Sequence, residues 1–192
     1  MRSPVVCVLV LVASLVGRDV VAQRRAAPSG GLWLAGGAGF GWSHVSCAIC
    51  GSSHEPGAAG FLRLGGATTR YLLIGAEAAI WFGGHGDVDR HAWALSAAAY
   101  WYPSARHRLY LKGGVGYASH RAEDGTDVIS STGFGPQLGV GYEFPLDRRW
   151  LLAPFFNAVF GAVGGGVKFN GATVQGAANV SVVQVGASLV RH

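Results

Sequence analysis

The chain has 192 residues, of which 50% are hydrophobic and 13% are charged, and its formal net charge is +5. A typical soluble domain carries about 25% charged residues, so this composition disfavours an ordinary soluble globular protein. The basic residues are scattered among expected turns, without basic runs or aromatic–basic interleaving, so no nucleic-acid partner is predicted.

The first 22 residues have the pattern of a secretory signal peptide. Arg2 gives a positive start, an apolar run of about a dozen residues follows at 5–16, and small residues stand at Val20 and Ala22. The run is too short to span a bilayer, since a membrane helix needs about 20 apolar residues. We therefore predict a signal peptide at 1–22, cleaved between Ala22 and Gln23.

The remaining chain is hydrophobic, yet it contains no apolar run of 18 residues, and 31 of the 192 residues of the whole chain are glycine. Membranes are spanned by apolar helices or by closed β-barrels, because every backbone polar group must be paired inside the lipid. An exported, hydrophobic chain without a membrane helix therefore favours a β-barrel.

Eight segments alternate between apolar and small or polar residues with a period of two. Alternation of this kind is expected of membrane barrel strands, whose side chains point in turn to lipid and to the interior. Pro136 and Pro154 fall on the outward parity, and we interpret them as bulge or strand-end positions. The segments span residues 32–42, 58–66, 71–82, 92–102, 109–119, 132–144, 150–161 and 179–192.

The connections between these segments alternate strictly between long and short. The long ones follow the first, third, fifth and seventh segments, and the short ones follow the others. Outer-membrane barrels place short turns on the periplasmic side and long loops outside the cell. The alternation therefore predicts periplasmic termini and four extracellular loops.

With these features the chain resembles the small eight-stranded outer-membrane β-barrels of Gram-negative bacteria. The resemblance implies an all-β, antiparallel, up-and-down transmembrane barrel in the outer membrane. It assigns residues 23–31 to a short periplasmic segment and 32–192 to the barrel. It also implies contact with outer-membrane lipid and, during biogenesis, with the barrel-assembly machinery.

Apart from Arg191 at the end of the last segment, four charged residues lie within the predicted strands, and all four fall on the inward parity. They are two basic and two acidic groups, so they can neutralise one another inside the barrel, and Arg63 and Glu77 lie on neighbouring strands. An eight-stranded interior is only wide enough for side chains. We therefore expect a structural charge network, and a proton or ion path is the alternative. The residues concerned are Arg63, Glu77, Lys112 and Glu143.

Outward aromatic residues near the strand ends are expected to form interfacial girdles, where amphipathic rings sit at the level of the lipid headgroups. The predicted girdle residues are Trp42, Phe82, Trp93, Trp101, Phe144 and Trp150.

Two predicted loops contain histidine beside acidic residues. Such groups at an outer rim suit general-base chemistry or metal binding. Solvated loop residues explain the same letters, and no nucleophile elbow or HExxH motif accompanies them. We therefore predict neither an enzyme nor a cofactor. The groups are His85, Asp87, Asp89 and His91, and His120, Glu123, Asp124 and Asp127.

The segment "SHVSCAICGSSHEP" contains Cys47 and Cys50, the only cysteines that remain after signal cleavage. Export passes through an oxidising compartment, where disulfides persist, so a local disulfide in the first extracellular loop is our preferred interpretation. A zinc site with His44 and His54 as further ligands is the alternative.

These features together predict a plugged outer-membrane barrel with a structural or surface-interaction role. Three alternatives remain open: a small-solute pore, an outer-membrane enzyme with a site at the rim, and a soluble lipocalin-like ligand carrier. A soluble carrier requires the opposite arrangement, with apolar side chains inside and polar ones outside.

Overall fold

The computed structural model describes residues 31–46, 53–85, 88–104, 107–161, 166–175 and 179–191. Within them no helix is long and apolar enough to cross a membrane. The described residues form eleven strands, which are β1 (Leu32–Ser46), β2 (Ser53–Thr69), β3 (Leu72–His85), β4 (Val88–Trp101), β5 (Leu109–Asp124), β6 (Asp127–Tyr142), β7 (Phe144–Pro145), β8 (Trp150–Gly161), β9 (Val167–Phe169), β10 (Ala172–Gln175) and β11 (Asn179–Arg191).

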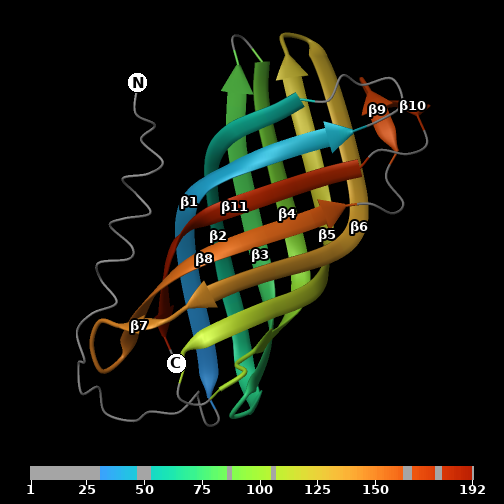
Figure 1. Ribbon diagram of the computed structural model, residues 1–192. Coiled ribbons are helices and arrows are strands. Elements are labelled where there is room, and N and C mark those ends of the chain that lie inside the picture. Colours follow the sequence, from blue (N-terminus) through green and yellow to red (C-terminus); the bar gives the residue numbers. More distant parts are fainter. Residues whose placement is uncertain are drawn as a thin grey trace, which may run out of the picture.

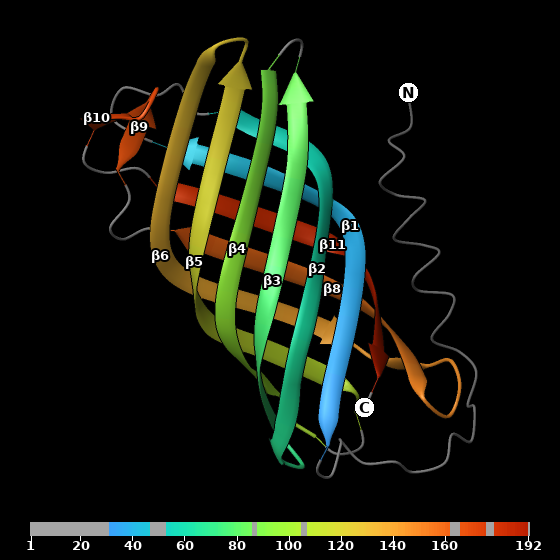
Figure 2. The same cartoon turned by 180° about the vertical axis from the view of Figure 1, so that it is seen from behind.

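Eight of these strands close into an antiparallel barrel (Figures 1 and 2). Each long strand pairs with the next along the chain, β8 pairs with β11, and β11 pairs with β1. The short strand β7 continues β6 beyond Glu143 and pairs with β8. We call the end that holds Leu32 and Arg191 the terminal end, and the opposite end the loop end. The predicted eight-stranded barrel is confirmed.

Side chains alternate between the two faces of the barrel wall as the sequence predicted. In β3, Ile74, Ile80 and Phe82 are exposed on the outside, whereas Glu77 and Trp81 are buried inside. Large apolar side chains are exposed on all eight barrel strands, including Leu62 at 66% and Val115 at 67%. An apolar surface that encircles the molecule is unfavourable in water but suits a lipid environment.

At the loop end the strands are longer than the alternation predicted. The expected long loops at 43–57, 83–91 and 120–130 are mostly strand, since β1 to β6 continue into them. Between β5 and β6 the connection is a two-residue turn, in which Gly125 has a φ of +57°. Above the apolar zone both faces of a strand are polar, so the alternation that marks a strand disappears there.

β6 and β8 meet in a short seam of five described residue pairs, from Gln137 opposite Val159 to Gly141 opposite Phe155. Pro136 lies directly beyond one end of this seam, and Pro154 lies directly beyond the other. Both prolines lie inside their strands and keep regular partners on their other side, without a register shift, so the interpretation as bulge or strand-end positions was wrong. Proline has no N–H to donate, and at the ends of the seam this costs no β6–β8 hydrogen bond.

The last predicted loop contains the β9–β10 hairpin. Asn170 and Gly171 occupy its turn with φ values of +47° and +84°, which suits an Asn–Gly pair. Asn170 also fastens the hairpin to β6: its backbone N–H donates to Val128 O at 2.9 Å, and its Oδ1 accepts from Val128 N at 2.8 Å. The hairpin therefore extends the sheet beside β6 at the loop end (Figure 1).

Candidate functional site

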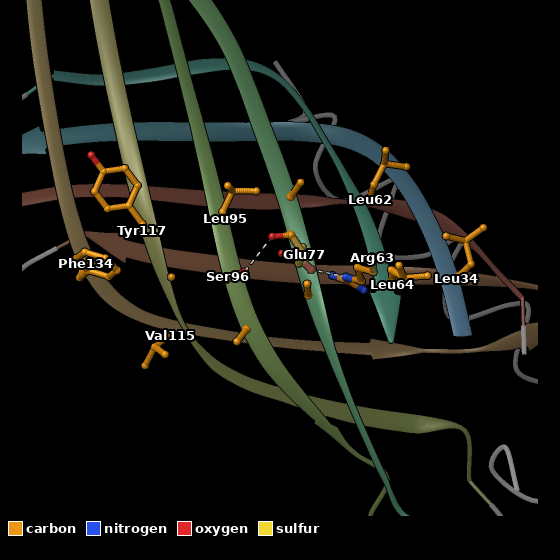
Figure 3. Close-up of a pocket in the computed structure, with 14 residues that line it drawn as sticks. Leu34, Leu62, Arg63, Leu64, Glu77, Leu95, Ser96, Val115, Tyr117 and Phe134 are labelled. Carbon is orange, nitrogen blue, oxygen red and sulfur yellow. Dashed lines mark hydrogen bonds and ion pairs between the residues drawn. The ribbon is translucent and has the colours of Figure 1, made fainter. Parts of the chain in front are cut away.

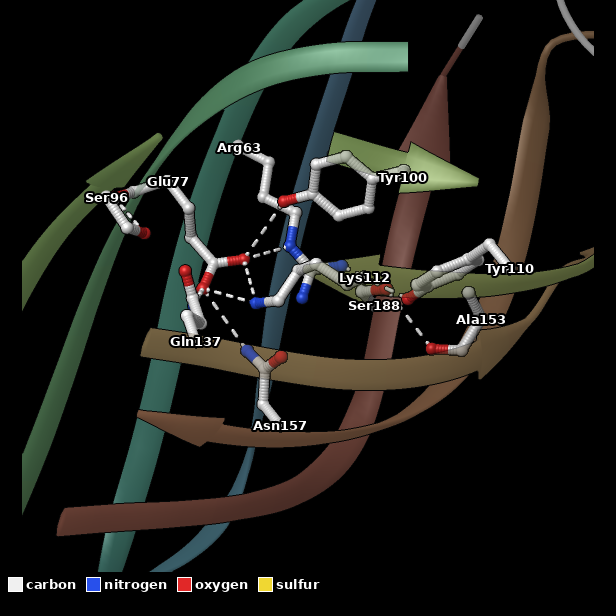
Figure 4. Close-up of polar contacts among 10 residues, drawn as sticks. All are labelled: Arg63, Glu77, Ser96, Tyr100, Tyr110, Lys112, Gln137, Ala153, Asn157 and Ser188. Carbon is white, nitrogen blue, oxygen red and sulfur yellow. Dashed lines mark hydrogen bonds and ion pairs between the residues drawn. The ribbon is translucent and has the colours of Figure 1, made fainter. Parts of the chain in front are cut away.

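A polar network centred on Glu77 crosses the barrel interior (Figure 4). Glu77 is 1% exposed, and its carboxylate accepts hydrogen bonds from five side chains on five other strands. One carboxylate therefore ties together six of the eight barrel strands. The donors are Arg63 Nε, Tyr100 Oη at 3.3 Å, Lys112 Nζ at 2.9 and 3.0 Å, Gln137 Nε2 and Asn157 Nδ2 at 3.2 Å.

Sheet register positions the charged pair at the centre of this network. Arg63 on β2 is the direct cross-strand partner of Glu77 on β3, and both point inward. Lys112 on β5 reaches the same carboxylate from across the interior. A buried charge is tolerated when it is paired and its hydrogen-bonding capacity is used, and both conditions hold for Glu77.

Buried aromatic rings pack beside this network inside the barrel. The Arg63 guanidinium lies 3.7 Å from the centroid of the Phe61 ring, within cation–π range, and its Nη1 donates to Tyr110 Oη at 3.1 Å. The Phe61 and Phe155 rings meet edge to face at 4.7 Å. Trp33, also buried, packs 4.6 Å from the Tyr100 ring centroid. The network and these rings are buried side by side inside the barrel.

The fourth predicted interior charge, Glu143, lies between β6 and β7 at the terminal end. It is buried, and its Oε1 accepts a hydrogen bond from Tyr102 Oη at 2.7 Å. The structure thus brings Arg63 and Lys112 to the Glu77 carboxylate. Glu143 instead lies beside Tyr102.

The interior at the loop end contains an ion pair that the sequence reasoning missed. Arg90 on β4 donates to Glu55 on β2, and both side chains are partly buried. Both residues had been assigned to loops. Both residues fall on the inward parity of β2 and β4 when the alternation is continued past the predicted strand ends. This parity was the signal in the sequence that could have identified them.

Below that pair, Trp81 is buried in the loop-end interior. Its Nε1 donates to Gly41 O at 3.1 Å, and its ring stacks with the buried His120 at a centroid distance of 6.4 Å. A void of about 10 Å³ beside Trp81 and Gln184 has room for at most a single water.

The six predicted girdle residues all lie on the outside of the barrel. Trp101, Phe144 and Trp150 stand at the terminal end, and the other three stand nearer the loop end. The exposed fractions are 43% for Trp42, 55% for Phe82, 40% for Trp93, 51% for Trp101, 43% for Phe144 and 37% for Trp150.

The predicted rim residues whose side chains the structure describes lie on both faces of the barrel wall. Asp89, His91, Glu123 and Asp124 lie in strands, where Asp89 and Glu123 are register partners, and His120 points inward. Among the residues that the structure describes, no group of three or more His, Cys, Asp or Glu side chains could hold a metal ion. Cys47, Cys50 and Asp87, the side chains of His54 and His85, and residues 1–30 lie outside the described residues.

No protein-family model matches the chain, and no curated protein matches it in sequence. Among solved structures, Neisserial surface protein A (NspA) is similar, with a TM-score of 0.57 and 15% identity over 85% of this chain and 99% of that one. Ail, the attachment invasion locus protein of Yersinia pestis, has a TM-score of 0.50 and 12% identity, over 82% of this chain and 97% of that one. At these identities the likeness shows the fold, a small eight-stranded barrel of the outer-membrane type.

Proposed function

We propose that this chain is an integral outer-membrane β-barrel with a plugged interior and a structural or surface-interaction role. The observation that carries the proposal is the network around Glu77, in which side chains from six strands meet inside the barrel. The buried side chains of this network and of the aromatic rings beside it support a plugged interior. Eight-stranded barrels are generally filled in this way.

The exterior supports the membrane part of the proposal. Large apolar side chains on all eight strands face outward, while Arg63, Glu77 and Lys112 are buried. A soluble ligand carrier needs the opposite arrangement. In the proposed orientation both termini are periplasmic, and the loop end projects from the outer surface as a rigid β-wall on which partners can bind.

Conductance in planar bilayers tests the plug. We expect the purified protein to shift in gel mobility on boiling, as folded barrels do, and to give no steady conductance steps. The double variant Glu77→Ala/Lys112→Ala removes side chains at the centre of the network and is expected to raise the leak. Arg149→Ala, in the turn before β8, is the matched control and is expected to remain silent. Steady steps from the unaltered protein would identify a pore instead.

A further inference from the structure

Five residues form a continuous row across five strands at the loop end. Each is the register partner of the next, from β4 through β5, β6 and β9 to β10. They share the outward parity of the wall, and they offer two permanent cations, an imidazole and two hydroxyls. We call them the headgroup row: His91, Arg121, Ser130, Lys168 and Thr173.

Two carboxylates lie next to this row, on the side away from the apolar wall. Glu123 pairs with Arg121 at 2.5 Å through Nε, and Asp89 is the register partner of Glu123. Among the described residues this ion pair engages one nitrogen of a guanidinium that has five N–H donors. The Arg121 and Glu123 side chains are 49% and 42% exposed, so Arg121 can still bind an anion that approaches from the membrane side.

Toward the terminal end from the headgroup row, the outer wall is hollowed by a groove of about 740 Å³. Figure 3 shows the residues that line it. Ala76 and Ala78 of β3 and Ala97 of β4 line it with short side chains between longer ones such as Leu62 and Val115. These residues are exposed on the face that the proposed function places in lipid. The groove is therefore open to the acyl chains of the bilayer.

The groove and the headgroup row share three strands, β4, β5 and β6. Leu95, Tyr117 and Phe134 line the groove and are cross-strand partners in order. Each stands four positions from a row residue on its own strand, which is a distance of about 13 Å. Tyr117 packs against Trp93 at 5.7 Å and against Phe134 at 5.0 Å, so an aromatic cluster lies between headgroup and chain positions. Aromatic rings favour this depth in a membrane.

We propose that one phosphate-bearing lipid of the leaflet at the loop end binds here, with its phosphate on Arg121 and Lys168 and an acyl chain in the groove. Charge complementarity selects the headgroup, because guanidinium and ammonium groups form strong charge-assisted hydrogen bonds with phosphate. The groove accommodates an acyl chain that lies along the outer wall of the barrel. The proposal rests on the membrane location argued above. Such a lipid would bind at this face and not at the remainder of the lipid-facing wall.

Native mass spectrometry from detergent micelles tests the site with three probes. Dimyristoyl phosphatidic acid has both headgroup and chains, dimyristoylglycerol has the chains alone, and glycerol phosphate has the headgroup alone. We expect a one-to-one adduct with phosphatidic acid, and binding about tenfold weaker with either partial probe. Equal binding of dimyristoylglycerol or of glycerol phosphate would overturn the proposal, because one part of the site would then suffice.

Variants locate the bound lipid. Arg121→Gln/Lys168→Gln and Ala97→Phe, which fills the groove, are each expected to weaken phosphatidic acid binding by about fivefold or more. Arg149→Gln at the terminal end and Ala187→Phe on the exposed face of β11 are the matched controls and should bind normally. Equal binding by all four variants would mean unspecific lipid around the barrel and would overturn the proposal.

A mobility shift on boiling is measured for every variant, so that loss of binding is scored only for folded barrels. If Ala97→Phe does not fold, Ala78→Leu fills the same groove. Failure of the unaltered protein to shift, or its recovery without detergent, would refute the membrane location. A folded barrel that lacks the lipid adduct would refute only the lipid site.

Discussion

Arg63 and Glu77 are direct cross-strand partners, and their ion pair is closed off from solvent inside the barrel. The same carboxylate holds Lys112. Because each cation relies on Glu77, the three charges act as one unit, and the loss of the carboxylate affects both partners.

Glu77→Gln is expected to destabilise the barrel by about 3–5 kcal/mol, because Arg63 and Lys112 would stay buried without a counter-charge. Glu123→Gln is the matched control. It removes an exposed carboxylate from a surface ion pair and should cost no more than about 1 kcal/mol. Unfolding by urea in detergent, followed by tryptophan fluorescence, measures both. Equal midpoints for the two variants would show that the network contributes little.

Removal of all three charges together should be less harmful than removal of one. Well-packed apolar replacements for a buried ion network are often neutral, since no desolvated charge remains. We expect Arg63→Met/Glu77→Leu/Lys112→Met to unfold at a higher urea concentration than Glu77→Gln. A triple variant that is weaker than the single one would show that the hydrogen bonds of the network, rather than its charge balance, hold the strands.

Gly83→Ala is expected to destabilise the loop-end interior by about 1–3 kcal/mol through overpacking. A Cβ at Gly83 would lie 2.4 Å from the Trp81 ring, whose position is held by its hydrogen bond to Gly41 O. Gly113→Ala is the control, because a Cβ there has no heavy atom within 4 Å. The difference in urea midpoint between the two alanine variants measures the effect, and Gly83→Ala/Trp81→Phe should recover part of it.

Amide hydrogen exchange should identify the β6–β8 seam as the first part of the barrel to open. The seam has five described residue pairs between Pro136 and Pro154, whereas β1 and β2 share fourteen. Local opening is easiest where the fewest contacts must break. We expect faster exchange for the amides of Val140 and Phe156 than for those of Ala38 and Gly60. Uniform protection around the barrel would contradict this expectation.

The turn before β8 contributes stability that depends on pH. Asp147 Oδ1 accepts from the backbone N–H groups of Arg149 at 2.6 Å and Trp150 at 2.8 Å, and these bonds hold the pKa of Asp147 below its usual value of 3.8. A lowered pKa stabilises the folded state above the unfolded pKa, and the contribution is lost as the pH falls through the folded pKa. Asp147→Asn can keep both bonds but does not titrate.

Urea unfolding between pH 5 and pH 2 therefore separates the two proteins. The unaltered protein should lose stability more steeply below pH 3.8 than Asp147→Asn. Parallel curves would mean that the turn also forms in the unfolded chain.

The inward and outward side chains of each predicted strand could be identified from the sequence, because alternation is a local property. A period of two assigns a face to every residue without knowledge of its neighbours, so Glu77 and Lys112 were placed inside and Trp93 and Trp150 outside. The number of barrel strands followed from the same pattern. The predicted strand ends at the loop end were too early because polar residues occupy both faces there, as at Glu55 and Arg90.

Tertiary structure alone decided which side chains meet. The five donors to Glu77 are separated from it by 14 to 80 positions, and only the register of the closed sheet brings Gln137 and Asn157 to one carboxylate. The headgroup row likewise exists because four strand registers align His91 with Thr173 across the wall. Alternation within a strand carries no information about the stagger between strands. The sequence by itself therefore determined which face each residue of the apolar zone occupies, and the closed barrel determined its partners.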